Sequence, residues 1–360
     1  MEFLNKTYFC DQYGKREQEV AISGSCFTQL CAIIYQNLKK EEKIGCGTLW
    51  LDSLLFSIKV KNGLPIRSCI RNKNAGTEKE VYDTSSVLIE GNEDLAEELM
   101  SKMLRERGMV IFRTIDKMLP ISKYYDPTFS DLSKFPAMGH VMLMVGEDRN
   151  YYYFVDQLNE INKDYCKTAD GRKDIFRWPK TEMKKLFGIY LKFILVDFNN
   201  MENSKLVKNN YSIIRDSVKG YFEERNNTRE ENDVLIFENR AALRWIRKFF
   251  DRNDLKLNKR VYRYPQGIET DATVKDEITN GITGIVNNRM LLIKFLQEIG
   301  WKKDIAFIVN SIEAWNQWKL FMMANYKKEK YELDGKYSAF IDNVFDAEEG
   351  MFETLKIWFD

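Results

Sequence analysis

The 360-residue chain lacks the features by which several classes of enzyme are identified from sequence. It has one histidine, His140, which excludes zinc sites built from paired histidines, and its six cysteines form no Cys-X-X-Cys pair. Neither a GxxxxGKS or GxxxxGKT phosphate loop nor a GxGxxG turn occurs. We therefore expect no bound metal and no bound nucleotide or other cofactor.

Net charge and long apolar runs are also missing. The 55 Lys and Arg residues balance 54 Asp and Glu residues, so no overall basic field points to nucleic acid. The first twenty residues lack the basic and apolar regions of a signal peptide, and the apolar run YLKFILV is too short to span a bilayer. These observations predict a soluble, cytoplasmic protein with no membrane partner, whose thiols are free rather than joined in disulfides.

The composition present suits a globular protein of two domains. The chain is 44% hydrophobic and 13% aromatic, and its length predicts two domains. Only Pro265 of the six prolines lies beyond residue 200, which favours a helical second part because proline is costly inside helices. The polar stretch NNMENS at 199–204 marks a linker. The expected domains are therefore residues 1–200 and residues 201–360.

Hydrophobic spacing predicts an α+β first domain and a helical second one. Two strand-like runs, at 141–145 and 151–155, flank a polar turn and are expected to form a hairpin. Gly108 is expected to end a helix as its C-cap. The expected helices span 25–38 and 95–107 in the first domain and 213–224, 241–250 and 289–299 in the second, and further strands span 109–113 and 190–196.

Cys26 is a candidate nucleophile because of what precedes it. Ser23, Gly24 and Ser25 supply N-cap hydroxyls and a flexible approach, so a helix is expected to begin at Cys26. Unpaired amides and the positive end of the helix dipole would favour the thiolate, and the same amides could receive an oxyanion during acyl transfer. The alternative is a small apolar residue packed in the first turn.

His140 and Asp156 are candidate partners for that thiolate. His140 follows Gly139 at the start of the first hairpin strand, and Asp156 ends the returning strand. An odd-numbered hairpin loop would set position 140 beside 156, whereas a two- or four-residue loop would set it beside Gln157. A carboxylate beside an imidazole stabilises imidazolium, which in turn holds a thiolate. The alternative is an ordinary strand residue and an ordinary turn residue.

The segments GSCFTQL and GHVMLMVGEDRNYYYFVDQ together resemble the papain-like cysteine fold. The resemblance is to bacteriocin-leader peptidases and to the acyltransferases of butirosin biosynthesis, whose second half is also similar to NRMLLIKFL and SIEAWNQWKLFM here. It implies an α+β papain-like domain, with an N-terminal helix packed on an antiparallel sheet, followed by an all-helical domain. It also implies a catalytic triad of Cys26, His140 and Asp156.

One position departs from the papain-like pattern. These enzymes usually place an oxyanion-hole glutamine six residues before the cysteine, and that position is Val20 here. Gln18 is the best substitute, with Ser25 behind it. The backbone N–H of Cys26 would then carry more of the oxyanion stabilisation.

The resemblance implies acyl transfer from a carrier protein. The donor would be a thioester on the phosphopantetheine of an acyl or peptidyl carrier protein, Cys26 would form the acyl-enzyme, and a small primary amine would take the acyl group as an amide. Related transglutaminase-like amide synthases use a diamine in this way. Two alternatives stay open: a cysteine endopeptidase that cleaves leader peptides, and a non-catalytic carrier-binding module, against which the intact candidate triad argues.

Three further segments have two interpretations each. Basic runs at 172–185 and 256–263 could dock an acidic carrier protein or could be solvated surface. The aromatic run at 151–154 could line an acyl tunnel or pack a core. Cys31, five residues after Cys26 in the same expected helix, should point elsewhere and belong to the core.

Overall fold

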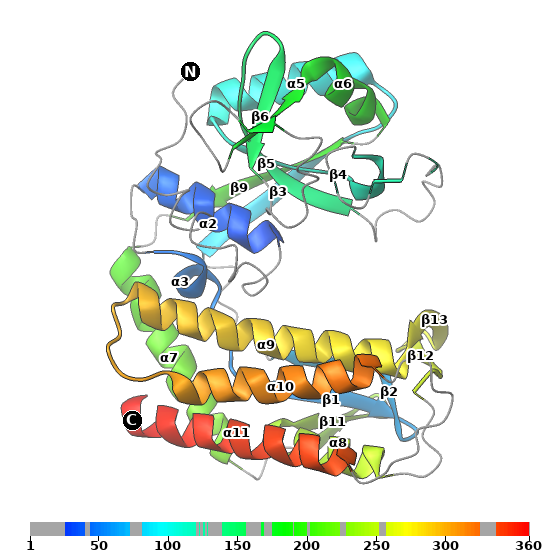
Figure 1. Cartoon of the computed structure of the whole chain (residues 1–360), viewed down its shortest axis with the longest axis vertical. Helices are drawn as coiled ribbons and strands as arrows, with labels where there is room; N and C mark the ends of the chain where they lie inside the picture. Colours follow the sequence, from blue (N-terminus) through cyan, green and yellow to red (C-terminus); the bar gives the residue numbers. More distant parts are fainter. Residues whose placement is uncertain are drawn as a thin grey trace. The chain divides into compact units, whose positions relative to one another are not determined.

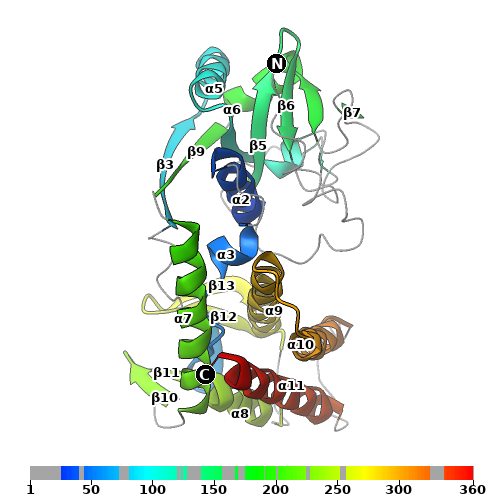
Figure 2. The ribbon, with the colours of Figure 1, turned by 90° about the vertical axis from the view of Figure 1, so that its left-hand side faces the viewer.

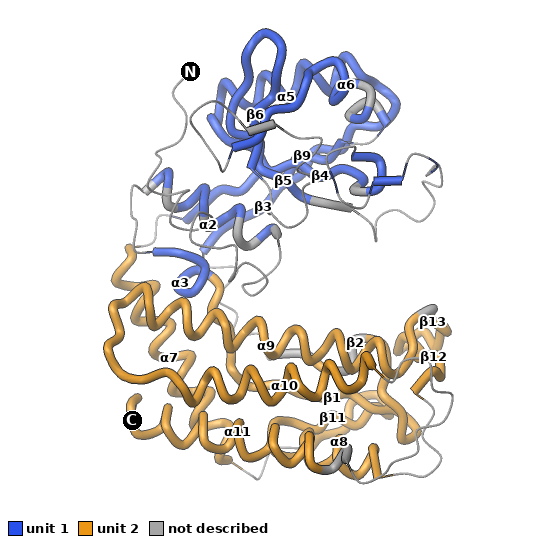
Figure 3. The backbone as a smooth tube through the Cα atoms, in the orientation of Figure 1, with its two compact units in different colours: residues 1–49, 78–200 blue, residues 50–77, 201–360 orange. Residues whose placement is uncertain are grey.

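The computed structural model describes most of the chain, and its residues fall into two compact units (Figure 3). Unit 1 comprises residues 1–49 and 78–200, and unit 2 comprises residues 50–77 and 201–360. Both combine helices with antiparallel strands, so the α+β expectation is confirmed. The described residues are 26–39, 44–72, 81–119, 122, 125–126, 128, 139–155, 167–168, 175–189, 191–199, 202–223, 228–251, 257–324 and 336–359.

Unit 1 is built on a seven-stranded antiparallel sheet with the order β3-β9-β4-β5-β6-β8-β7 (Figure 1). Its strands are β3 (Tyr82–Ile89), β4 (Val110–Ile115), β5 (Gly139–Glu147), β6 (Tyr151–Val155), β7 (Lys167–Thr168), β8 (Phe176–Pro179) and β9 (Leu191–Phe198). Its helices are α2 (Cys26–Lys39), α5 (Glu93–Arg107) and α6 (Lys180–Ile189), with the short α3 (Cys46–Trp50) and η2 (Asp116–Met118). The expected hairpin is present as β5 and β6.

Helices α5 and α6 cover one face of this sheet. The side chain of Asn92 caps α5 by accepting a hydrogen bond from the Leu95 N–H at 3.0 Å, and Gly108 ends it with φ 73°, as the sequence predicts. Alternate strand residues point toward the two helices. The resulting core includes Met100 and Leu104 of α5, Met183 and Leu186 of α6, and Phe112, Met142, Met144, Tyr152, Phe154 and Phe193 of the strands.

Helix α2 lies on the opposite face of the sheet. Ile111 alternates with Phe112 along β4 and pairs with Leu143 of β5, so both belong to the face away from α5 and α6. Ile34 of α2 lines the same hollow as Ile111. The ring of Tyr35 meets the ring of Phe198 edge-on, with 5.1 Å between centroids. The sheet of unit 1 is therefore sandwiched between helices.

Unit 2 combines a four-stranded sheet of order β10-β11-β1-β2 with five long helices (Figures 1 and 2). Figure 2 views α9 and α10 nearly end-on, with α11 oblique and α7 upright beside them. A two-residue turn at Asn62 and Gly63, with φ 51° and 72°, joins β1 to β2. The elements are β1 (Phe56–Lys61), β2 (Leu64–Asn72), β10 (Thr228–Glu231), β11 (Val234–Glu238), the hairpin β12 (Arg260–Arg263) and β13 (Ile268–Thr273), α7 (Asn203–Phe222), α8 (Asn239–Phe250), α9 (Val274–Glu298), α10 (Ala306–Ala324) and α11 (Lys336–Phe359).

The expectation of an all-helical domain at residues 201–360 is wrong. That segment contains β10 to β13, and the hairpin of β1 and β2 at residues 56–72 joins the same sheet because β1 pairs with β11. The first domain is therefore not continuous over residues 1–200. Proline scarcity and helical spacing are local signals, whereas the pairing of Ile58 with Phe237 joins positions far apart in the sequence.

Helix α9 begins with a capping box that offers a local test of the fold. The Asp276 N–H donates to Oγ1 of Thr273 at 3.2 Å, and the Asp276 carboxylate accepts from the Thr273 N–H at 2.9 Å. We expect Thr273→Ala to lower the free energy of unfolding by about 1 kcal/mol, while Thr273→Asn, which keeps a capping oxygen, costs less. Urea unfolding measures both, and equal stability of Thr273→Ala and wild type would contradict the cap.

Candidate active site

The first described residue of α2 is Cys26, in agreement with the predicted helix at 25–38. The backbone of Cys26 is helical. Ser25 and Gln18, the candidate oxyanion donors, lie outside the described residues. Within the described residues, α2 therefore begins at Cys26.

Position 140 lies at the beginning of β5, as predicted. Gly139 pairs with Ile115 of β4, and His140 pairs with the fully buried Thr114. Met142 and Met144, further along β5, belong to the core on the α5 and α6 side. By strand alternation, backbone position 140 belongs to the same row as these two residues.

The hairpin turn is organised by Asp148. One oxygen of its carboxylate accepts hydrogen bonds from the N–H groups of Asn150 and Tyr151 at 2.7 and 2.8 Å, and the other accepts from the Tyr153 hydroxyl at 2.6 Å. Partial burial opposes ionisation, but these hydrogen bonds hold the pKa of Asp148 below its usual value. The turn is therefore fixed by an ionised carboxylate.

The hairpin of β5 and β6 connects the strand that contains His140 to the strand that precedes Asp156. Leu143 faces Val155, and the register shifts by one residue between Met144 and Gly146. Asp156, which follows Val155, lies outside the described residues, as does Gln157. Helix α2 packs against β5. The helix of Cys26 and the strand of His140 are thus in contact, and the residue before Asp156 lies on the neighbouring strand.

The aromatic run at 151–154 is divided between core and surface. Tyr152 and Phe154 are fully buried among the residues that face α5 and α6, and the Phe154 ring lies 5.9 Å from the ring of Phe176. Tyr151 and Tyr153 are only partly buried. The core interpretation therefore applies to Tyr152 and Phe154.

Cys31 is a core residue, as predicted from its position. It is fully buried on α2, Cys46 is also buried, and neither cysteine forms a disulfide. Burial, with a smaller contribution from neighbouring Cys46, raises the pKa of the Cys31 thiol. Neither buried thiol has the exposure of a reactive cysteine.

Thiol labelling tests this assignment. We expect iodoacetamide to leave Cys31 and Cys46 unmodified in the native protein and to alkylate both in urea, because burial blocks access and disfavours the Cys31 thiolate. Peptide mapping by mass spectrometry separates the two sites. Alkylation of native Cys31 at the rate found in urea would contradict the structure.

The two basic segments proposed for docking differ in how far acidic groups neutralise them. In 172–185, Lys180 pairs with Glu147 at 2.6 Å and Lys184 pairs with Asp94 at 2.7 Å. In 256–263, Arg260 and Arg263 are exposed on β12. Arg260 lies 3.7 Å from Glu269, so its ion pair is longer than those of Lys180 and Lys184.

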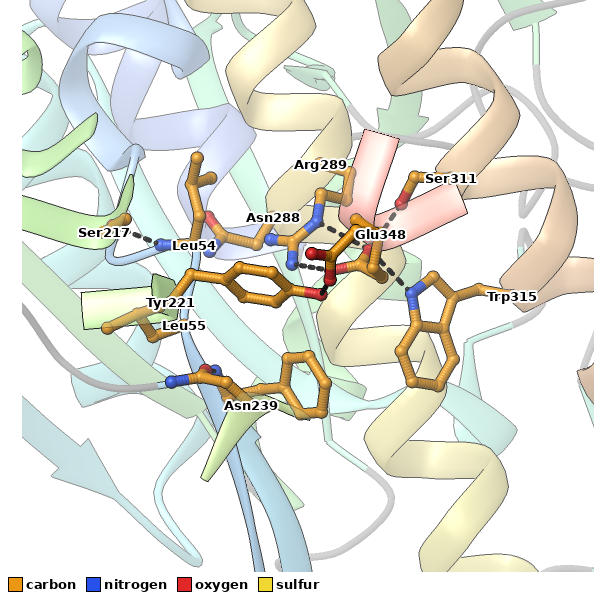
Figure 4. A network of polar contacts seen from close by, with 12 residues as sticks. Leu54, Leu55, Ser217, Tyr221, Asn239, Asn288, Arg289, Ser311, Trp315 and Glu348 are labelled. Carbon is orange, nitrogen blue, oxygen red and sulfur yellow. Dashed lines mark hydrogen bonds and ion pairs between the residues drawn. The ribbon is translucent and has the colours of Figure 1, made fainter. Parts of the chain in front are cut away.

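A buried polar network in unit 2 was not predicted from the sequence (Figure 4). The guanidinium of Arg289 on α9 donates to both oxygens of Glu348 on α11, at 3.3 and 2.8 Å, and neither side chain is exposed. Ser311 and Trp315 of α10 also donate to Glu348. The network ties three helices together and is closed to solvent, so its role is structural.

No family model matches the sequence, and no curated protein matches it. Within the described residues, no helix combines the length and the apolar character needed to cross a membrane. The same residues hold no cluster of three or more His, Cys, Asp or Glu placed to bind a metal ion.

Proposed function

We propose that this chain is a cysteine-dependent acyltransferase that forms amide bonds in natural-product biosynthesis. The observation that carries the proposal is the contact between α2, whose first described residue is Cys26, and β5, whose second residue is His140. A helix packed on an antiparallel sheet in this way supports a papain-like fold for unit 1. That Cys31 and Cys46 form no disulfide supports a reducing, cytoplasmic location.

In the proposed first half-reaction, the Cys26 thiolate attacks the carbonyl carbon of a thioester on the phosphopantetheine of a carrier protein. A bond forms between that carbon and the Cys26 sulfur, the bond to the phosphopantetheine sulfur breaks, and the leaving thiolate takes a proton from His140. The oxyanion is stabilised by N–H groups of the first turn of α2, with Gln18 and Ser25 as further donors.

In the second half-reaction, a primary amine attacks the acyl-enzyme. A carbon–nitrogen bond forms, the Cys26 carbon–sulfur bond breaks, and the amine proton passes to His140, which Asp156 orients. Thioester exchange is nearly isoenergetic and aminolysis is favourable, so no ATP is consumed. Water has to be kept from the acyl-enzyme, because hydrolysis competes with the amine.

The register of β5 limits where these groups can meet. Position 140 belongs to the row of Met142 and Met144, which face α5 and α6, whereas α2 covers the other face. The proposal therefore places the reacting groups at the end of the sheet where β5 begins. If the reaction took place on the sheet face that α2 covers, Cys26 would need a partner other than His140.

A chase experiment distinguishes the proposed transferase from a peptidase. The protein is loaded with a small acyl thioester, freed of excess reagent, and then incubated with a primary amine, a diamine or buffer alone. We expect the amines to convert the adduct to amide faster than buffer hydrolyses it. Hydrolysis at one rate with and without amine, together with cleavage of a peptide panel, would replace the transferase by a leader-peptide endopeptidase.

A further inference from the structure

A second site is indicated by a hollow of about 230 Å³ in unit 2, between the turn joining β1 to β2 and strand β12. Three residues with cationic side chains, Lys61, Lys259 and Arg260, border it, together with Tyr262 and Tyr264. No carboxylate is among the described residues that line it. The only charged residues among them are therefore cationic, which suits an anion.

Lys61 is held in place before any ligand arrives. It ends β1, next to the turn at Asn62 and Gly63, and its side chain is only 21% exposed. Its ammonium nitrogen lies 4.5 Å from the centroid of the Tyr264 ring. Tyr264 in turn packs against a small core cluster formed by Ile66, Val234 and Ile236. The ammonium group is thus fixed on a packed aromatic ring.

Lys259 and Arg260, the first residue of β12, are fixed through their backbone. The Lys259 carbonyl accepts a hydrogen bond from the Val274 N–H, the first residue of α9, at 2.8 Å. Arg260 pairs with Thr273 in the ladder of β12 and β13. The backbone of Lys259 is therefore anchored by the beginning of α9, and that of Arg260 by the hairpin.

Nearby carboxylates neutralise these cations only weakly. Asp233 lies 3.7 Å from the Lys61 nitrogen and its side chain is 86% exposed. Glu269 lies 3.7 Å from Arg260, with half of its side chain exposed. Ion pairs this long and this exposed contribute little and are screened by salt. The hollow therefore keeps a positive potential that a bound anion can use.

We propose that this hollow binds the phosphate group of a phosphate ester. It is smaller than the roughly 300–1,000 Å³ of pockets that enclose a whole drug-sized ligand, so it fits one anionic group with a few attached atoms. Three separate cations match the charge of about −2 and the three acceptor oxygens of a phosphate monoester better than a carboxylate. The inference goes beyond the proposed acyl transfer and does not depend on it.

Calorimetric titration of the full chain tests the proposal, with inorganic phosphate and phosphopantetheine as probes. We expect saturable binding that weakens at least about tenfold in Lys61→Gln and in Arg260→Gln. The exposed Lys259→Gln, which disturbs no packed ring, should also weaken binding. Lys219→Gln is the matched control, because Lys219 is 76% exposed on α7 in the same unit and does not line the hollow.

The relative affinities of the two probes distinguish a ligand with an organic arm from phosphate alone. Tighter binding of phosphopantetheine than of phosphate, with the same loss in the variants, indicates a ligand with an organic arm, and equal binding indicates recognition of phosphate alone. Either result supports the site. No saturable binding of either probe below about 10 mM, or an equal loss in Lys219→Gln, overturns it. Acyl transfer is measured separately, with a thioester that contains no phosphate. Neither of the two results that overturn the phosphate site would change the result of that measurement.

Discussion

Replacing Glu348 by glutamine is expected to lower the free energy of unfolding by about 3–5 kcal/mol, because the change leaves the Arg289 guanidinium buried without its counter-ion. Both side chains have no exposed surface, and their closest contact is 2.8 Å (Figure 4). Ser311 and Trp315 donate to the same carboxylate. Glutamine offers these donors one carbonyl oxygen in place of a carboxylate, and its NH₂ group would meet the guanidinium.

Urea unfolding followed by circular dichroism measures this loss. Glu349→Gln is the matched control, because the neighbouring Glu349 is 25% exposed and pairs with Arg240 at 3.4 Å, so we expect a loss of about 1 kcal/mol or less. The double variant Arg289→Met with Glu348→Leu should recover most of the stability, since it buries no unpaired charge. A Glu348→Gln protein as stable as the control variant would contradict the network.

Gly281→Ala is expected to destabilise unit 2 by about 3 kcal/mol, through overpacking. Gly281 lies on the side of α9 that packs against β2, and an added Cβ would overlap the Cβ of Ile70. Ile70 is buried and the position of its Cβ is set by the backbone, so a rotamer change cannot relieve the overlap. The helix or the strand has to shift, which disturbs the packing of α9 on the sheet.

Gly284 provides a matched control three residues further along α9. An added Cβ at Gly284 would meet nothing within 4 Å. We therefore expect Gly284→Ala to raise the free energy of unfolding by about 0.5–1 kcal/mol, because alanine restricts the unfolded chain and favours the helix. The two substitutions should thus differ in sign when urea unfolding is measured. A change of the same sign at both positions would contradict the close approach of α9 to Ile70.

The parts of the fold that depend on local signals could be predicted from the sequence. Alternation on either side of a polar turn predicts the hairpin of β5 and β6, and Gly108 predicts the end of α5. A helix that contains Cys26 and a strand that contains Gly139 are likewise predicted from nearby residues. Each of these features is specified by residues within about one turn of helix or one strand.

The parts that depend on distant pairing could not be predicted. The hairpin of β1 and β2 has no local feature that assigns it to unit 2 rather than to the sheet of unit 1. Arg289 and Glu348 have the composition of an exposed helix surface, and only the packing of α9 against α11 buries them together. The hollow at Lys61 likewise joins two segments about 200 positions apart in the sequence.

The candidate site could be predicted only as far as its elements. The sequence predicts a helix beginning near Cys26 and a strand beginning near His140, and the two elements pack together. Which face of β5 carries position 140 depends on the pairing of His140 with Thr114 and on the side of the sheet that α5 and α6 cover. That information is tertiary and leaves no local signal.

The most direct test of the account is whether Cys26 accepts an acyl group. Intact-protein mass spectrometry is performed before and after mixing with a small acyl thioester, on wild type, Cys26→Ala and Cys31→Ala. The account predicts a mass gain of one acyl group in wild type and Cys31→Ala and none in Cys26→Ala, because Cys31 is fully buried and Cys26 is the proposed nucleophile. A gain that persists in Cys26→Ala, or no gain in wild type with any thioester, would contradict it.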